Sequence, residues 1–126
     1  MPDGWEVLYF GNTGRNGGGD WDGDGMRDHA EYVAGTVPTN GASRFDMRLT
    51  ATRTAATLSF MAVQGEPGNP GLRRLYSMES ATGLVHGVWM GLPGLTNMVN
   101  LSGKTSVTSP APPGAIFYRG KVWLEP

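Results

Sequence analysis

The chain has 126 residues, a formal net charge of −1 and no cysteine. This length fits one ordinary domain, or a small domain with an appendage, and argues against a large enzyme. Without cysteine, disulfides and thiolate sites are excluded, and no apolar run reaches the roughly 18 residues of a membrane span. The 20 glycines and nine prolines indicate many tight turns, which are more typical of short strands than of long helices.

The charges divide the chain into two parts. Residues 1–40 carry seven acidic and two basic side chains, a balance of −5, whereas residues 41–126 carry four acidic and eight basic ones, a balance of +4. The hydrophobic pattern changes at the same place, from helical spacing to short apolar runs between turn residues. We therefore expect a separate segment over residues 1–40 and a β module over residues 41–126.

A short helix is predicted over residues 3–10. Asp3 and Glu6 have the spacing of a capping box, and Gly11 can end the helix in the left-handed region. Residues 12–19 show no periodicity and are rich in glycine, so we expect a flexible connector there. The side chains predicted to share the buried face of the helix are Trp5, Leu8 and Tyr9.

The stretch over residues 20–31 places five carboxylates and one glycine at the spacing of a calcium-binding loop. Calcium prefers six to eight oxygen ligands, which a twelve-residue loop supplies from positions 1, 3, 5, 7, 9 and 12. Gly25 occupies position 6, where the loop turns sharply. An acidic surface loop is the alternative, but carboxylates this close together repel one another unless a cation lies among them. The predicted ligands of one Ca²⁺ are the side chains of Asp20, Asp22, Asp24, Asp28 (through a water molecule) and Glu31, with the backbone carbonyl of Met26.

A second helix is predicted over residues 27–34, beginning inside the loop. Gly35 and Pro38 would end it. Packing its few apolar side chains against the first helix contributes only a few kcal/mol at about 25 cal/mol per Å², so this segment needs its cation or a neighbour for stability. The predicted apolar stripe consists of Met26, Ala30 and Val33.

Residues 41–126 alternate between short apolar runs and turn residues. This pattern predicts a small antiparallel β-sandwich of about six or seven strands. The fold class is therefore mainly β, with a short helix-loop-helix segment before the sandwich. Loops are expected at residues 65–71 and 109–114. Strands are predicted near residues 45–51, 57–63, 72–79, 88–92, 97–101, 105–108 and 116–124.

Two-residue alternation assigns faces to these strands. The residues predicted to face the core are Leu58, Phe60 and Ala62 on one strand, Tyr76 and Met78 on the next, and Tyr118, Val122 and Leu124 on the last. The opposite face of the last strand would carry an aromatic and basic row, formed by Phe117, Arg119, Lys121 and Trp123. We expect this row to contact the acidic helical segment, with a ligand-binding surface as the other interpretation.

The first part of the chain contains five short motifs, Pro2-Asp3-Gly4-Trp5-Glu6, Tyr9-Phe10-Gly11, Asp22-Gly23-Asp24-Gly25, Glu31-Tyr32-Val33-Ala34-Gly35-Thr36 and Pro38-Thr39-Asn40. Together they resemble the thrombospondin type 3-like calcium-binding segments of large secreted bacterial proteins. The loop is also similar to those of EF-hands and dockerins. In such proteins the segment often leads into a small sandwich, and residues 72–92 with Phe117-Tyr118-Arg119 look like that fibronectin type III-like module.

Two departures from these families bear on the number of ions. EF-hand loops usually carry an aliphatic residue at position 8, through which two loops pair, and Arg27 stands there in this chain. The thrombospondin-like pattern usually has Asp where Val37 stands. The resemblance therefore implies a lone loop that binds one ion.

The sequence predicts a non-catalytic, extracellular module that rigidifies or spaces the domains of a larger secreted or cell-surface protein. Millimolar calcium is found mainly outside cells, which favours this location. Catalysis would need paired groups within reach, but the two histidines, His29 and His86, lie in different parts of the chain. The scattered arginines do not form the basic patch of a nucleic-acid-binding protein. The expected partners are the neighbouring domains of the parent protein.

The alternative is a carbohydrate- or surface-binding module. Exposed aromatic side chains would stack on a ligand, and basic side chains would supply polar contacts. Tryptophans of small sandwiches are more often part of the core, which makes this the second interpretation. The candidate residues are Trp89, Trp123, Phe117 and Tyr76 for stacking, and Arg73, Arg74, Arg119 and Lys121 for polar contacts.

Overall fold

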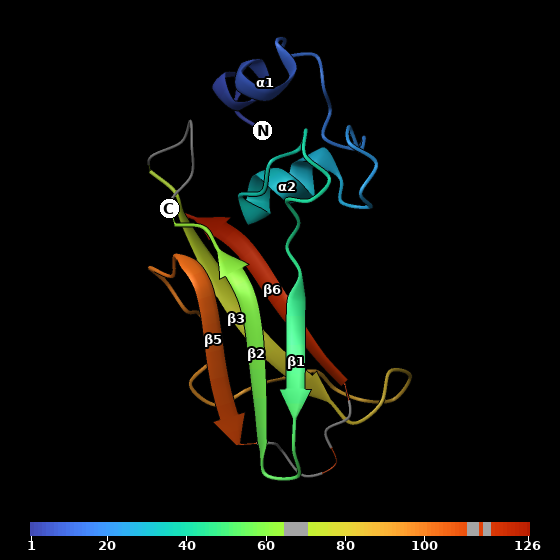
Figure 1. Ribbon diagram of the computed structural model, residues 1–126, viewed down its shortest axis with the longest axis vertical. Helices are drawn as coiled ribbons and strands as arrows, with labels where there is room; N and C mark the ends of the chain where they lie inside the picture. The colour runs from blue at the N-terminus through green and yellow to red at the C-terminus, as the bar shows by residue number, and fades with distance from the viewer. Residues whose placement is uncertain (65–70, 111–113, 115–116) are drawn as a thin grey trace.

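The computed structural model describes residues 1–64, 71–110, 114 and 117–126. Figure 1 shows two short helices at one end of the molecule and the strands at the other. The helices fall in residues 1–40 and the strands in residues 41–126. The elements are α1 (Asp3–Phe10), α2 (Asp28–Ala34), β1 (Met47–Ala51), β2 (Ala55–Ala62), β3 (Arg73–Ala81), β4 (Met90–Gly91), β5 (Gly103–Pro110) and β6 (Phe117–Glu125).

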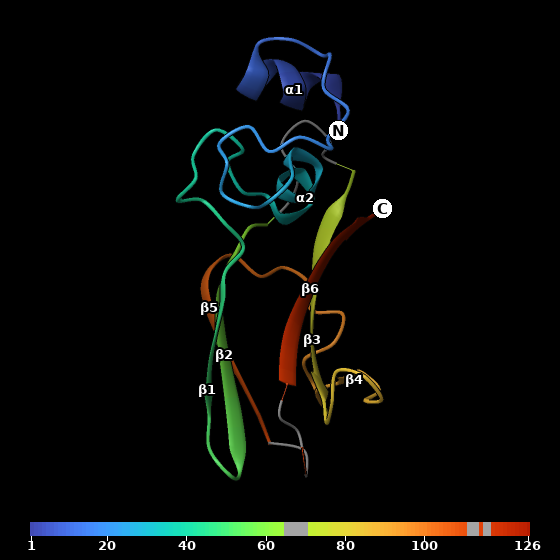
Figure 2. The ribbon, with the colours of Figure 1, turned by 90° about the vertical axis from the view of Figure 1, so that its right-hand side faces the viewer.

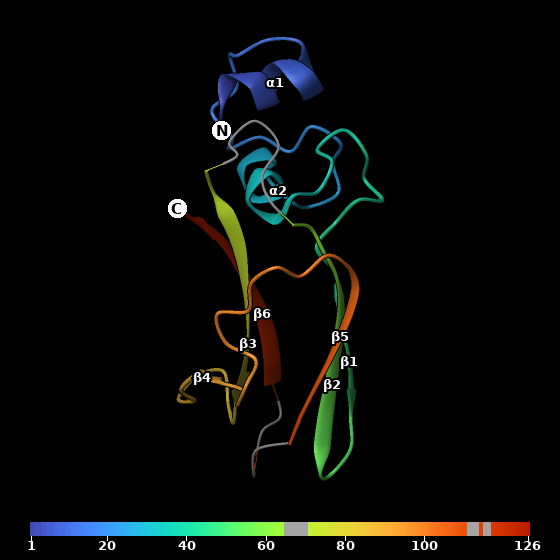
Figure 3. The same ribbon diagram turned by 90° about the vertical axis from the view of Figure 1, so that its left-hand side faces the viewer.

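The strands form two antiparallel sheets of three strands each, ordered β1-β2-β5 and β4-β3-β6. In the first sheet, Leu58 of β2 lies opposite Leu49 of β1 and Val107 of β5. In the second sheet, Tyr76 of β3 lies opposite Val122 of β6. Figures 2 and 3 show the sheets as two layers, with both helices beyond one end of them. The chain is thus mainly β, as predicted.

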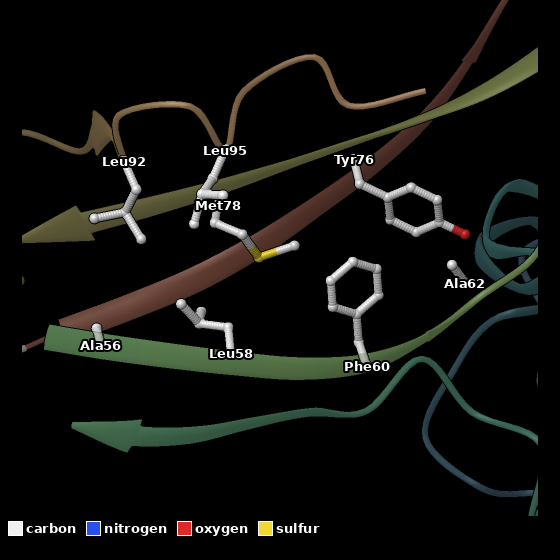
Figure 4. Packing of buried hydrophobic residues seen from close by; sticks show 8 residues of the cluster. All are labelled: Ala56, Leu58, Phe60, Ala62, Tyr76, Met78, Leu92 and Leu95. Carbon is white, nitrogen blue, oxygen red and sulfur yellow. The ribbon is translucent and has the colours of Figure 1, made fainter. Parts of the chain in front are cut away.

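The main core lies between the two sheets. Leu58 and Phe60 of β2 point toward Tyr76 and Met78 of β3 (Figure 4). These four side chains and Ala62, all predicted to face the core, are between 0 and 5% exposed. The ring of Phe60 lies 5.1 Å from that of Tyr76, centroid to centroid. Full burial of one large apolar side chain is worth about 1.5–3 kcal/mol, so this cluster is the main source of stability in the β part.

The segment between β3 and β5 departs from the prediction. The sequence predicts strands near residues 88–92 and 97–101, but the structure has only the two-residue β4 and a single bridge at Met98. Asn97 and Asn100 adopt left-handed conformations, with φ of 53° and 60°, and such residues interrupt an extended run. The segment contacts β3 through irregular backbone hydrogen bonds, such as that from the N–H of Met78 to the carbonyl of Leu95 at 2.8 Å, and through buried side chains. Its buried side chains are Leu92 and Leu95.

Several strand ends also differ from the prediction. β1 begins at Met47 rather than at residue 45. β5 continues through Pro110, so the loop expected from Ser109 begins later. Three stretches lie outside the described residues. They are residues 111–113 of that loop, residues 65–70 of the loop predicted at 65–71, and the predicted strand start at Ile116.

The first helix, α1, has the predicted bounds but a different buried face. Trp5 and Phe10 are buried, whereas Leu8 is 67% exposed. The predicted capping box does not form, because the carboxylate of Glu6 instead accepts a hydrogen bond from the backbone N–H of Arg15 at 3.0 Å. The glycine-rich connector is therefore tied to the helix that precedes it.

The second helix, α2, begins at Asp28, one residue later than predicted, and both helices end at left-handed glycines, Gly11 and Gly35. The predicted apolar stripe is wrong, because Ala30 is exposed. The buried side chains are instead Asp28, Glu31, Tyr32 and Ala34. Carboxylates are rarely buried without partners, so the two acidic side chains on the buried face of this helix need partners.

The helical part meets the β part where α2 approaches β6. Leu124 of β6 packs against a small aromatic cluster formed by Trp5, Phe10 and Tyr32. Alternation places Leu124 on the inner face of β6, opposite to the row of Phe117, Arg119, Lys121 and Trp123. The predicted contact between that row and the helical segment is therefore wrong, since β6 uses its other face for this contact.

Candidate metal centre

The loop over residues 20–31 is organised by the carboxylate of Asp20. Its Oδ1 accepts hydrogen bonds from the backbone N–H groups of Gly23 at 2.8 Å and Asp24 at 3.2 Å, and its Oδ2 accepts one from Gly25 at 2.9 Å. The hydrogen bond from Gly25 lowers the pKa of Asp20. Gly23 and Gly25 have φ of 74° and 98°, which side chains with a Cβ rarely adopt. These glycines let the chain fold back around the carboxylate.

In Asp22, Asp24 and Glu31, one oxygen of each carboxylate accepts a hydrogen bond. The Oδ1 atom of Asp22 accepts the N–H of Asp24 at 3.2 Å, and the Oδ1 atom of Asp24 accepts the N–H of Met26 at 2.8 Å. In α2, the Oε1 atom of Glu31 accepts the hydroxyl of Thr36 at 3.3 Å. These bonds fix the orientation of all three carboxylates.

The second oxygen of each of these three carboxylates is buried and accepts no hydrogen bond within the part of the chain that the structure describes. The atoms are Oδ2 of Asp22, Oδ2 of Asp24 and Oε2 of Glu31. Native proteins satisfy nearly all buried polar atoms, and an uncompensated buried carboxylate costs several kcal/mol. Three such atoms in one loop therefore require an explanation, and a cation between them supplies one.

The three aspartates at the start of the loop converge on one region. Ligand atoms of Asp20, Asp22 and Asp24 all lie within 4.8 Å of one another. Burial, together with the negative charges of Asp22 and Asp24, raises the pKa of Glu31 to about 7. Glu31 is completely buried. A hard divalent cation with oxygen ligands matches this set of donors.

The structure gives Asp28 a different role from the predicted one. Its Oδ1 accepts the backbone N–H of Trp21 at 3.0 Å, and its Oδ2 accepts Nε of Arg15 at 2.6 Å within a salt bridge to the same guanidinium. Both oxygens accept hydrogen bonds from protein donors, which is the role that the structure shows for Asp28, and the predicted water-mediated contact to the ion stays a prediction. We assign Asp28 to the frame of the loop, where it joins the connector to α2.

Arg15 is the functional residue that sequence reasoning missed. Its guanidinium lies 4.6 Å from the ring centroid of Phe10 and 4.8 Å from that of Trp21, while it pairs with the buried Asp28. It therefore links α1, the loop and α2. Of the two basic residues in residues 1–40, this one lies in a connector without periodicity, where the sequence gives no signal for a long-range partner.

Met26 contributes to the loop with both backbone and side chain. Besides donating its N–H to Asp24, it accepts the backbone N–H of Phe45 on its sulfur at 3.4 Å. This contact connects the loop to the chain entering β1. The predicted coordination by the Met26 carbonyl is not tested by these contacts and stays a prediction.

A buried arginine connects the metal loop to the β part. Arg74 of β3 donates from Nε to the carbonyl of Val33 at 2.6 Å and from Nη2 to that of Tyr32 at 3.2 Å, both at the end of α2. Its Nη1 donates to the carbonyl of Val63 at 2.9 Å. The expectation that Arg74 contacts a ligand is wrong, because the side chain is buried and caps α2.

Most of the other aromatic and basic candidates lie on the outer face of the second sheet, whereas Trp89 precedes β4 and Tyr76 is buried in the core. Glu79 accepts Nε of Arg119 at 2.9 Å and Nζ of Lys121 at 3.1 Å. Burial acts to raise the pKa of Glu79, but these two ion pairs outweigh it and lower that pKa. The guanidinium of Arg119 lies 4.2 Å from the ring of Trp89. Phe117 and Trp123 are half-buried on the same face.

Comparison with known proteins does not assign a family to the chain. No family model, curated protein or solved structure matches it. Within the described ranges, neither helix has the length and apolar content needed to cross a membrane. The function is therefore inferred from the chemistry of the loop and its connection to the sheets.

Proposed function

We propose that this chain is a non-catalytic, calcium-binding accessory module of a larger secreted or cell-surface protein. One Ca²⁺ binds the loop over residues 20–31 and holds the helical segment against a fibronectin type III-like β-sandwich, so that neighbouring domains are spaced at a fixed geometry. The observation that carries this proposal is the set of three buried, unpartnered carboxylate oxygens from Asp22, Asp24 and Glu31. The resemblance of the motifs to thrombospondin type 3-like segments supports it.

The ligand set follows from the oxygens that remain available. Asp22 and Asp24 each offer one free oxygen, and Glu31 offers Oε2 from the last position of the loop. Asp20 adds a negatively charged carboxylate at the mouth of the site, with its pKa lowered by the backbone of the loop. The backbone carbonyl of Met26 completes the protein ligands, and water would fill the remaining positions of a six- to eight-coordinate ion.

Calcium would act on the whole module because its last ligand is part of α2. Glu31 lies one and two residues before Tyr32 and Val33, whose carbonyls accept hydrogen bonds from Arg74 of β3. Ordering Glu31 around an ion therefore orders the helix end that holds the arginine. The aromatic cluster beneath Leu124 adds a second, apolar contact between the two parts.

Calorimetric titration with Ca²⁺ tests the proposal. Wild type should bind one ion with an affinity of about 10⁻⁴ to 10⁻³ M or tighter, the range of extracellular modules. Glu31→Gln keeps the shape of the side chain but removes its charge and should weaken binding strongly. The matched control is Asp46→Asn, which removes an exposed carboxylate outside the loop and should leave the affinity unchanged. An absence of saturable heat in wild type, or equal affinities in wild type and Glu31→Gln, would contradict the proposal.

A further inference from the structure

A groove lies on the outer face of the β4-β3-β6 sheet, away from both the core and the metal loop. It has a volume of about 790 Å³, within the roughly 300–1,000 Å³ of small-ligand sites. Its floor comes from β3, one wall from β6, and the other from the segment that follows β4, which Figure 3 shows beside β3. The lining residues that matter here are Ser77, Glu79, Thr96, Asn97, Lys121 and Trp123.

The wall formed by the segment after β4 is held in a fixed position. The backbone N–H of Leu92 donates to the carbonyl of Met78 at 2.9 Å, and Leu95 is buried beneath the segment. The backbone N–H of Asn97 donates to the hydroxyl of Ser77 at 2.8 Å. Asn97 has a left-handed conformation, with φ of 53°, which asparagine adopts more readily than most residues other than glycine.

The groove combines one aromatic ring with polar groups whose charges cancel. Trp123 is half-buried and lines the groove. The cation Lys121 and the anion Glu79 pair with each other at 3.1 Å, so the lining has no net charge. Within the described parts of the chain, the side-chain amide of Asn97 and the hydroxyl of Thr96 make no hydrogen bond, which leaves donors and acceptors available on the wall facing Trp123.

We propose that this groove binds an uncharged oligosaccharide of pyranose units. A pyranose ring has an apolar C–H face, which packs on an indole, and a rim of hydroxyl groups, each of which both donates and accepts hydrogen bonds. Asn97 and the Lys121–Glu79 pair offer both kinds of partner around Trp123. An anionic ligand is disfavoured because it would meet the carboxylate of Glu79 beside Lys121. Of the predicted row on β6, only Lys121 and Trp123 line the groove, while Arg119 is stacked on Trp89.

Titration by ¹H–¹⁵N NMR, with cellohexaose, xylohexaose and mannohexaose as probes, tests this site. At least one probe should cause saturable shifts at the indole N–H of Trp123 and at the amide of Asn97. Trp123→Ala should weaken that binding about tenfold or more, since truncation of an aromatic anchor typically costs more than 1 kcal/mol. The matched control is Trp21→Ala, which removes a tryptophan that is 53% exposed in the metal loop and should leave sugar affinity unchanged.

A second variant keeps the test valid if Trp123→Ala does not fold. Asn97→Gly removes the amide side chain but retains the left-handed backbone at no steric cost, and it should also weaken sugar binding. Failure of all three probes to bind at millimolar concentration would overturn the proposal, as would binding that neither variant weakens. Preferential, salt-sensitive binding of hexagalacturonate would overturn the assignment of an uncharged ligand. Repeating the titration with chelator separates this site from the metal loop, because no lining residue belongs to that loop.

Discussion

Replacement of Arg74 by methionine should uncouple the metal loop from the β part. Methionine keeps an unbranched stem of similar width but donates no hydrogen bond, so the carbonyls of Tyr32, Val33 and Val63 lose the partners that they have at 2.6 to 3.2 Å. A buried hydrogen bond to a charged group is worth about 1.5–3 kcal/mol. The three bonds share one side chain and are not additive, and water reaches part of the opened site, so we expect a loss of about 3 kcal/mol in the free energy of unfolding.

Urea unfolding in excess calcium, followed by circular dichroism, measures this loss. A change of this size is on the order of a hundredfold in the folding equilibrium. Arg73→Met is the matched control, because the neighbouring guanidinium of Arg73 is exposed and pairs with the partly exposed Glu125, and such pairs are worth at most about 1 kcal/mol. Arg74→Met should also bind calcium more weakly, since Glu31 belongs to the helix that Arg74 caps. Equal stability of the two variants, or unchanged calcium affinity in Arg74→Met, would refute this reasoning.

Three further variants test other parts of the account. In the calcium-free chain, Glu31 keeps its proton up to about pH 7 when folded and loses it near pH 4.5 when unfolded, so urea unfolding in chelator should show stability falling as the pH rises through this interval. Glu31→Gln should flatten that slope, and a rise in stability would contradict the burial of this carboxylate. Arg15→Met leaves the buried carboxylate of Asp28 without its cation and should lower calcium affinity, by a free energy smaller than the roughly 3–5 kcal/mol that breaking a fully buried pair costs. Calcium titration of Arg27→Met should match wild type. Gly35→Ala should lower the melting temperature, because the φ of Gly35 is 78° and an added Cβ would lie 2.8 Å from Cζ of Arg74. The left-handed backbone alone costs about 1–2 kcal/mol. Gly4→Ala should leave the melting temperature unchanged, because an added Cβ at Gly4 meets open space.

The loop and the core were predictable because both depend on local spacing. Carboxylates two residues apart and a glycine at position 6 make the loop fold back in the way that the hydrogen bonds of Asp20 now show. Alternation along β2 and β3 places Leu58 and Tyr76 in the core, because successive strand residues point to opposite faces. In these regions each residue acts through neighbours in sequence or through a regular repeat.

The contacts that join the two parts were not predictable from local spacing. Alternation with Tyr76 and Met78 places Arg74 rather than Arg73 on the inner face of β3, but the sequence does not show what partner a charged residue would have there. The partners of Arg74 are backbone carbonyls about 40 residues away along the chain. Backbone carbonyls are present at every residue, so the pattern of side chains does not indicate which of them accept a hydrogen bond. Asp28 likewise fits the loop spacing, yet tertiary structure pairs it with Arg15. Long-range pairing therefore decided which charged residues join the parts of the structure.

The most direct test of the central claim is a crystal structure grown in millimolar calcium, with anomalous scattering to locate the ion. We predict one Ca²⁺ at about 2.3–2.6 Å from Oδ2 of Asp22, Oδ2 of Asp24 and Oε2 of Glu31, with Asp28 still paired to Arg15. An anomalous peak elsewhere, or protein hydrogen-bond donors on these three oxygens with no ion between them, would contradict the account.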